Sequence, residues 1–194
     1  MNRLLTTTVG CSFALLALPT LAIAQAGGFT TLFDGSSLDG WSVLGNANWE
    51  LSEGAVSANS GNGFLVSEES YGDFELSLEF WVDTPANSGI FIRCSDPQSV
   101  NDRNSYEVNI YDTRADQTYR TGGIVHLAAP SAVINSGGQW NTYQITALGS
   151  RLVVNLNGTQ TVDTTDDQFT SGPIALQYGA GIVRFRNVRI RSLD

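Results

Sequence analysis

The stretch YGDFELSLEFWVDTPANSGIFIRC, residues 71–94, alternates apolar and polar side chains in each of its halves. Successive side chains of a β-strand point to opposite faces, so this alternation predicts two half-buried strands, Phe74–Val82 and Gly89–Cys94. Each strand carries a charge on the face away from its apolar side, Glu79 in the first and Arg93 in the second. We ask whether this polar face is only solvated or whether it holds a ligand.

Short alternating runs of this kind continue along the chain, separated by Gly, Asn, Asp and Ser, and no long helical period interrupts them. Gly149-Ser150 and Asn157-Gly158 are typical of tight hairpin turns. The pattern predicts an all-β fold, a two-sheet antiparallel β-sandwich. Besides the two strands above, we expect strands at Phe29–Phe33, Trp49–Ser52, Ala55–Ala58, Phe64–Ser67, Ser105–Tyr111, Gly123–Leu127, Thr142–Leu148, Arg151–Leu156, Ile174–Tyr178 and Ile182–Arg191.

The N-terminus has the features of a secretory signal peptide. Arg3 is followed by an apolar run, and Ala24-Gln25-Ala26 is a small-residue cleavage site. Removing residues 1–26 leaves 168 of the 194 residues, which suits a single domain over residues 27–194. Cys94 is then the one remaining cysteine, so no disulfide forms within the chain. These features predict a bacterial protein that is secreted or periplasmic.

The charge of the chain limits its partners. The formal net charge is -9, and all ten basic residues are arginines that are scattered or near the C-terminus. This composition argues against nucleic acid and against anionic membrane surfaces as partners. No second apolar run is long enough to span a bilayer, so we expect no membrane insertion after signal cleavage. A neutral ligand such as a sugar is compatible with this charge.

Several motifs, in register over nearly all of the chain after the signal, resemble the 3-keto-disaccharide hydrolase domain family. They begin with TLFDGSSLDGW at residues 31–41 and continue with YGDFELSLEF, NSGIFIR, SYEVNIYD, TGGI, WNTYQI, VNLNG, GPIALQ and VRFRNVRI. The resemblance implies a concanavalin A-like jelly roll with a concave sheet that can cradle a carbohydrate. It also implies cleavage of glycosides that are already oxidised at C3 of the sugar ring, in some members by elimination followed by hydration.

The chain differs from the family pattern at two places. Asn109 stands where the family usually has Gln. After its LQ motif the family commonly has an acidic residue, His and Gly, whereas here Gln177 is followed by Tyr178-Gly179-Ala180-Gly181. A non-catalytic, lectin-like carbohydrate-binding module therefore stays open as an alternative. An adhesion or envelope protein is a third hypothesis.

A ketone at C3 makes the proton on C2 acidic, so the reaction needs a base, a group that stabilises the enolate oxygen and an acid for the leaving group. We expect Glu107 to be the base, since it lies mid-strand between apolar neighbours. Arg93 is the candidate for stabilising the enolate. His126, the only histidine, is the candidate acid, because its charge changes near neutral pH.

A second set of residues is expected to bind the substrate. Alternation puts Glu79, Arg93, Glu107, Asn109 and Gln177 on one outer face, provided that their strands adjoin in one sheet. Trp81 and Tyr111 could stack on a sugar ring. Asp112 could bind a divalent metal such as Ca2+, although a turn aspartate is equally compatible with its position. Glu79 and Arg93 could instead form an ion pair on a solvated sheet.

Overall fold

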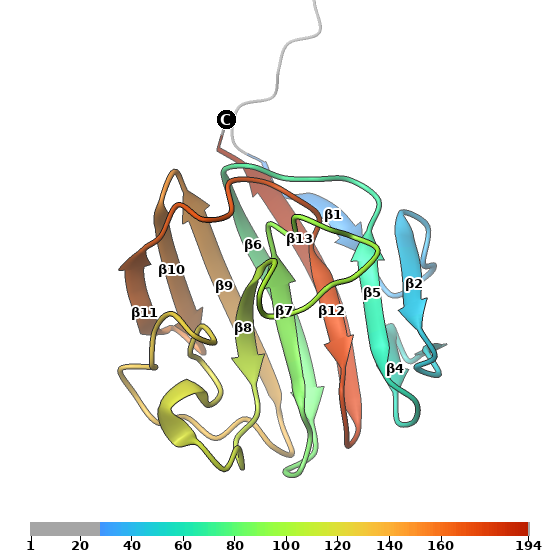
Figure 1. Ribbon diagram of the computed structural model, residues 1–194. Coiled ribbons are helices and arrows are strands. Elements are labelled where there is room, and N and C mark those ends of the chain that lie inside the picture. The colour runs from blue at the N-terminus through green and yellow to red at the C-terminus, as the bar shows by residue number, and fades with distance from the viewer. Residues whose placement is uncertain (1–27, 194) are drawn as a thin grey trace, which may run out of the picture.

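The computed structural model describes residues 28–193, so the signal peptide predicted at residues 1–26 lies outside the described part. Two antiparallel sheets pack face to face, and the predicted all-β sandwich is confirmed (Figure 1). The front sheet has the strand order β2-β5-β12-β7-β8. Its strands are β2 (Trp41–Gly45), β5 (Gly63–Ser67), β7 (Ser88–Ile92), β8 (Tyr106–Ile110) and β12 (Ala175–Tyr178).

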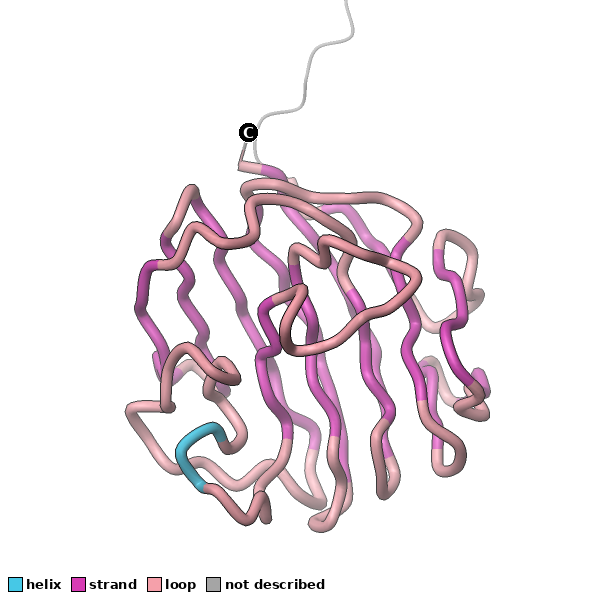
Figure 2. The backbone as a smooth tube through the Cα atoms, in the orientation of Figure 1, coloured by secondary structure: helices cyan, strands magenta, loops and turns pink. Residues whose placement is uncertain are grey.

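The back sheet has eight strands in the order β11-β10-β9-β6-β13-β4-β3, with β1 paired to β13. Its strands are β1 (Thr30–Phe33), β3 (Glu50–Ser52), β4 (Ala55–Ala58), β6 (Phe74–Val82), β9 (Trp140–Leu148), β10 (Arg151–Leu156), β11 (Thr159–Thr165) and β13 (Val183–Ser192). Among the described residues the one helical element is a short 3-10 turn at Gln117–Tyr119 (Figure 2). No helix in the part of the chain that the structure describes could cross a membrane.

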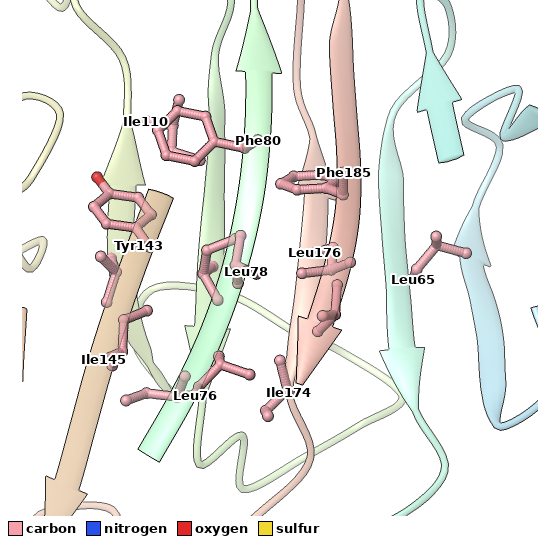
Figure 3. Packing of buried hydrophobic residues seen from close by; sticks show 14 of the residues in the cluster. Leu65, Leu76, Leu78, Phe80, Ile110, Tyr143, Ile145, Ile174, Leu176 and Phe185 are labelled. Atoms are coloured by element: carbon pink, nitrogen blue, oxygen red, sulfur yellow. The ribbon is translucent and has the colours of Figure 1, made fainter. Parts of the chain in front are cut away.

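The core lies between the two sheets and is built by the alternation seen in the sequence. Leu76, Leu78 and Phe80 of β6 point toward the front sheet, where Leu176 of β12 and Ile110 of β8 meet them (Figure 3). All five side chains are at most 1% exposed to solvent. Since one face of every central strand is fixed in this core, the opposite face is presented outward.

Most expected strands are present, and three differences are informative. The structure adds β2 and β11, whose sequences WSVLG and TQTVDTT do not alternate cleanly. The segment 123–127 is a loop with isolated bridges instead of a strand, and its residues hydrogen-bond to β8 and to one another. The Asn157-Gly158 hairpin is confirmed, and both residues have positive φ, 51° and 79°, as a type I′ turn requires.

One bulge explains the spacing of apolar residues in β13. The pairing with β6 shifts between Arg186 and Arg189, and Asn187 has a φ of 53°. The extra residue lets Phe185 and Val188, three positions apart, both point into the core. The arginines on either side of the bulge therefore stay on the outer face of the back sheet.

The β7–β8 loop, residues 93–105, crosses the outer face of the front sheet in front of β12 and β5 (Figure 1). Val100 attaches the loop to this face by packing into a second apolar cluster, separate from the main core. The other buried members of this cluster are Val66, Phe91, Cys94 and Ala175. The loop is thus held in place on the outer face of the front sheet, where Val100, Asn101 and Asp102 form one side of a hollow.

Candidate active site on the front sheet

A hollow of about 390 Å³ lies on the outer face of the front sheet, beside the β7–β8 loop. We call it the Glu107 pocket. The strands contribute Phe64, Phe91, Glu107 and Gln177 to its lining, and the adjoining loops contribute Asn62, Asn87, Val100, Asn101, Asp102, Tyr111 and Arg114. Its volume lies in the range of pockets that bind small molecules.

Strand register brings the floor of the pocket together. Phe91 of β7 is paired with Glu107 of β8, and Gln177 of β12 is paired with Phe64 of β5. The rings of Phe64 and Phe91 meet edge to face with centroids 5.2 Å apart. Gly89 has no side chain, and this leaves room for the carboxyl group of Glu107. Polar groups therefore sit beside an aromatic floor, an arrangement that suits a ligand with both apolar and hydroxylated surfaces.

Glu107 is the most perturbed acid in the pocket. Its side chain is 8% exposed, and burial, followed by the negative charge of Asp102, raises its pKa to about 7, while Arg114 opposes the shift. A carboxyl group with such a pKa can take up and release a proton near neutral pH. Strongly shifted acids in clefts are candidates for catalysis.

Other polar groups in the pocket have hydrogen-bonding capacity to spare. Gln177 Oε1 is buried and has no partner among residues 28–193. Arg114 lies in the lining near enough to influence the charge of Glu107. An unpartnered buried oxygen is costly unless a ligand or water supplies a donor. The pocket thus offers an acceptor, a cation and a titratable carboxyl group to one ligand.

Asp102 connects the pocket with a neighbouring hollow. It lines both, and its Oδ2 lies 2.9 Å from His126 Nε2. His126 has a φ of 64°, unusual for a residue with a side chain, and its ring contacts Tyr119 edge to face at 5.9 Å. His126 lines the neighbouring hollow and not the Glu107 pocket, so Asp102 is the residue that lies between them.

Comparison with known proteins decides the family. The sequence profile of the 3-keto-alpha-glucoside-1,2-lyase-like domain matches residues 28–191. The chain belongs to this family. A 3-keto-disaccharide hydrolase of Bacteroides thetaiotaomicron is 31% identical over 80 residues, which make up 34% of this chain and 28% of that relative. The family places the chain among carbohydrate-active, glycosyl hydrolase-like domains.

Solved structures agree on the fold. A candidate glycosyl hydrolase of Parabacteroides distasonis superposes with a TM-score of 0.78 at 18% identity, over 86% of this chain and 94% of that one. The carbohydrate-binding module CBM66 of Bacillus subtilis superposes with a TM-score of 0.62 at 19% identity, over 79% and 96% of the two chains. These matches confirm the jelly-roll sandwich.

The structure places Arg93 away from the Glu107 pocket, so the expectation that it shares the outer face is wrong. Arg93 follows the end of β7, has a φ of 53° and is 1% exposed. Its guanidinium group donates to the carbonyls of Gly72, Gly149 and Phe169 and to Asp73 Oδ1 at 2.9 Å. The left-handed backbone turns the side chain inward, where it ties three loops together.

Glu79 and Trp81 are also not on the predicted face, because β6 belongs to the back sheet and not to the sheet that carries Glu107. Glu79 accepts hydrogen bonds from Arg186 at 2.7 Å and from Asn187 at 2.8 Å. The guanidinium carbon of Arg184 lies over the Trp81 ring, 5.2 Å from the ring centroid. Both residues belong to a ladder of cross-strand pairs on the outer face of the back sheet.

Asn109 and Tyr111 follow Glu107 along β8, and the loop after β8 covers the first of them. Asn109 is fully buried, and its Nδ2 donates to the carbonyl of Tyr119. Tyr111 remains in the lining of the pocket. The structure therefore brings together Glu107, Tyr111 and Gln177 of the predicted site, with Asn109 beneath the loop.

Asp112 organises this loop. Its carboxylate accepts from Thr121 Oγ1, from both the backbone and hydroxyl of Ser136 and from the backbone of Gly137, at 2.6–3.0 Å. These donors already occupy both oxygens, so the surroundings do not fit ligation of a metal. Ca2+ binding at Asp112 stays a prediction from sequence.

Sequence reasoning missed the contributions of the loops. Asp102 and Arg114 lie in polar connections whose composition signals only a turn. Phe64 and Phe91 alternate with core residues and look like apolar strand positions of no special role. A signal for Phe91 was available, since it occupies the outward position between Ile90 and Ile92.

Proposed function

We propose that the protein is an enzyme that cleaves glycosides oxidised at C3, and that the Glu107 pocket is its active site. The observation that carries this proposal is a buried carboxyl group with a pKa of about 7 in a polar pocket of a family member. An ordinary exposed glutamate would be a much weaker base. The predicted base is thus supported by its surroundings.

In the proposed reaction, ionised Glu107 removes the proton from C2, next to the ketone. The electrons of the C2–H bond form the C2–C3 double bond of an enolate, with negative charge on the C3 oxygen. The C3 ketone then reforms, the electrons of the C2–C3 double bond form a C1–C2 double bond, and the C1–O bond breaks with its electron pair on the leaving oxygen. Glu107, now protonated, returns the proton to the leaving oxygen, so the elimination is balanced without a redox partner.

Two other groups support this chemistry. The positive charge of Arg114 suits the developing enolate oxygen, a role that the sequence suggested for Arg93. The unpartnered Gln177 Oε1 can accept a hydrogen bond from a sugar hydroxyl. The role of His126 as an acid stays a prediction, and its ring contacts Asp102, which also lines the Glu107 pocket.

A second candidate function is carbohydrate binding without turnover. The likeness to a carbohydrate-binding module and the replacement of the family's His after Gln177 favour it. In this case the same pocket holds a sugar, and Glu107 serves as a hydrogen-bonding group.

The deciding experiment measures release of aglycone from a 3-keto-glucoside by purified protein, with and without a chelator. We expect Glu107→Gln to lower kcat/KM by at least about 100-fold, the usual scale for loss of a general base, with the fold intact. Glu79→Gln is the matched control, since this carboxyl group lies on the other sheet. Sugar binding by wild type with no turnover of 3-keto-glucosides would instead establish the binding module.

We also propose that the protein acts outside the cytoplasm. The support is the sequence of residues 1–26, together with the bacterial origin of the relative.

A further inference from the structure

A second hollow, of about 180 Å³, lies on the outer face of the back sheet, on the side of the sandwich opposite to Glu107. Its polar lining consists of Glu75 and Ser77 of β6, Gln144 and Thr146 of β9, and Asn155 of β10. Phe29, just before β1, adds an aromatic ring to the lining. We call this hollow the Phe29 pocket. Its size suits one ring-sized group.

The polar side chains of the Phe29 pocket are aligned by the register of three neighbouring strands. Ser77 is paired with Gln144, and Gln144 is paired with Asn155. Glu75 and Thr146 form a second pair, two residues along the same strands. Paired positions on a sheet lie about 5 Å apart, so the groups form a rigid and regularly spaced grid.

This grid has unused hydrogen-bonding capacity. Within residues 28–193, the structure shows no hydrogen bond to the side chains of Ser77, Gln144, Thr146 or Asn155. Gln144 is exposed, Thr146 and Asn155 are partly exposed, and Ser77 is 8% exposed, so a ligand in the hollow can reach these polar groups. Two amides and two hydroxyls supply both donors and acceptors. The hydroxyls of a sugar present the same mixture.

The charge of the pocket favours a neutral ligand. Its one carboxylate, Glu75, is paired with Arg191, and the guanidinium groups of Arg191 and Arg189 lie 5.2 and 5.7 Å from the Phe29 ring centroid. The positive charges are therefore engaged by a carboxylate and an aromatic ring. Glu75 would repel an anion, and a cation would have to compete with Arg191 for the carboxylate of Glu75.

We propose that the Phe29 pocket is a second carbohydrate site, which binds a neutral sugar unit without turning it over. Phe29 covers an apolar side of the ring, while the amides of Gln144 and Asn155 and the hydroxyls of Ser77 and Thr146 bind its hydroxyls. Because this pocket and the Glu107 pocket lie on opposite sheets, one protein can hold a glycan chain on one side and act on a small glycoside on the other.

The test is an NMR titration of 15N-labelled protein with methyl β-glucoside and cellobiose as neutral probes and with glucuronate as an anionic probe. We expect neutral sugars to perturb the backbone amides of Ser77 and Gln144 and the side-chain amide of Asn155. Thr146→Ala, and the double variant Gln144→Ala with Asn155→Ala, should weaken this binding by about ten-fold or more.

Thr142→Ala is the matched control, because Thr142 lies on the same strand and face as Thr146 but outside the lining. Glu107→Gln should leave these perturbations unchanged, so failure of the proposed enzyme function and failure of this site give different results. The proposal is overturned if neutral sugars perturb none of these amides, if Thr142→Ala weakens binding as much as Thr146→Ala does, or if glucuronate binds more tightly than the neutral sugars.

Discussion

Gly89 and Glu107 lie on neighbouring strands of the front sheet, and a β-carbon at Gly89 would be 3.0 Å from Glu107 Oε1 and 3.1 Å from its Cγ. These distances are shorter than ordinary contacts, so Gly89→Ala should displace the carboxyl group by a few tenths of an ångström. We expect kcat/KM for a 3-keto-glucoside to fall by about ten-fold or more, since small displacements of a reacting group are costly.

The control for Gly89→Ala is Gly28→Ala, because an added β-carbon there meets nothing within 4 Å. Thermal unfolding of both variants separates displacement of Glu107 from general loss of stability. Unchanged turnover in folded Gly89→Ala protein would contradict the role of this glycine.

The raised pKa of Glu107 has a consequence for stability. In the unfolded chain its pKa is near 4.5, and in the folded protein it is about 7. Below pH 4.5 Glu107 is protonated in both states. Between pH 4.5 and about 7 it is ionised in the unfolded chain and protonated in the folded protein. Stability is therefore lost as pH rises from about 4.5 to 7, by an amount on the order of 3 kcal/mol at most.

Glu107→Gln removes this penalty, so the variant should be more stable than wild type at pH 8 and similar to it at pH 4. Urea unfolding at both pH values measures the difference. Glu79→Gln should not reproduce the gain, and a Glu107→Gln variant that is less stable than wild type at pH 8 would show that the charged form is stabilised in the fold.

The buried guanidinium group of Arg93, which pairs with the partly exposed Asp73, should contribute strongly to stability. Arg93→Met removes the donor that Arg93 supplies to three carbonyl groups, and a buried acceptor that loses its donor costs about 1–3 kcal/mol. We therefore expect a loss on the order of 3 kcal/mol, while Asp73 keeps its hydrogen bond from the backbone of Gly149. Arg151→Met is the control, since its pair with Asp163 is exposed and should contribute less than about 1 kcal/mol. Equal urea midpoints for the two variants would refute a structural role for Arg93.

Tyr143 links the core to the loop that carries Arg114. Its hydroxyl donates to the carbonyl of Asn109 at 2.7 Å and accepts from the backbone of Gly122 at 2.9 Å. Tyr143→Phe keeps the stacking on Phe80 but should cost about 1 kcal/mol, because both backbone groups lose one hydrogen bond and keep the 3.1 Å bond from Gly122 N–H to the Asn109 carbonyl. Hydrogen exchange should accelerate at Gly122, and unchanged exchange there would count against the link.

The local pattern of the sequence predicted much of the fold. The alternation in Phe74–Val82 correctly separated core residues from outward residues, and Asn157-Gly158 correctly marked a hairpin. Glu107 was recognisable as a carboxyl group between two core positions. These features are local. The alternation of side chains along a strand and the positive φ of a hairpin turn each depend on only a few consecutive residues.

The sequence by itself determined which side of each strand faces the core, and the tertiary structure alone decided which strands are neighbours. Consecutive strands β6 and β7 join opposite sheets, so Glu79 and Glu107 end on opposite sides of the molecule. Alternation cannot distinguish these outcomes, since it specifies a face and not a partner. Asp102 and Arg114 reach the pocket only because packing of Val100 and the contacts of Asp112 fix their loops beside it.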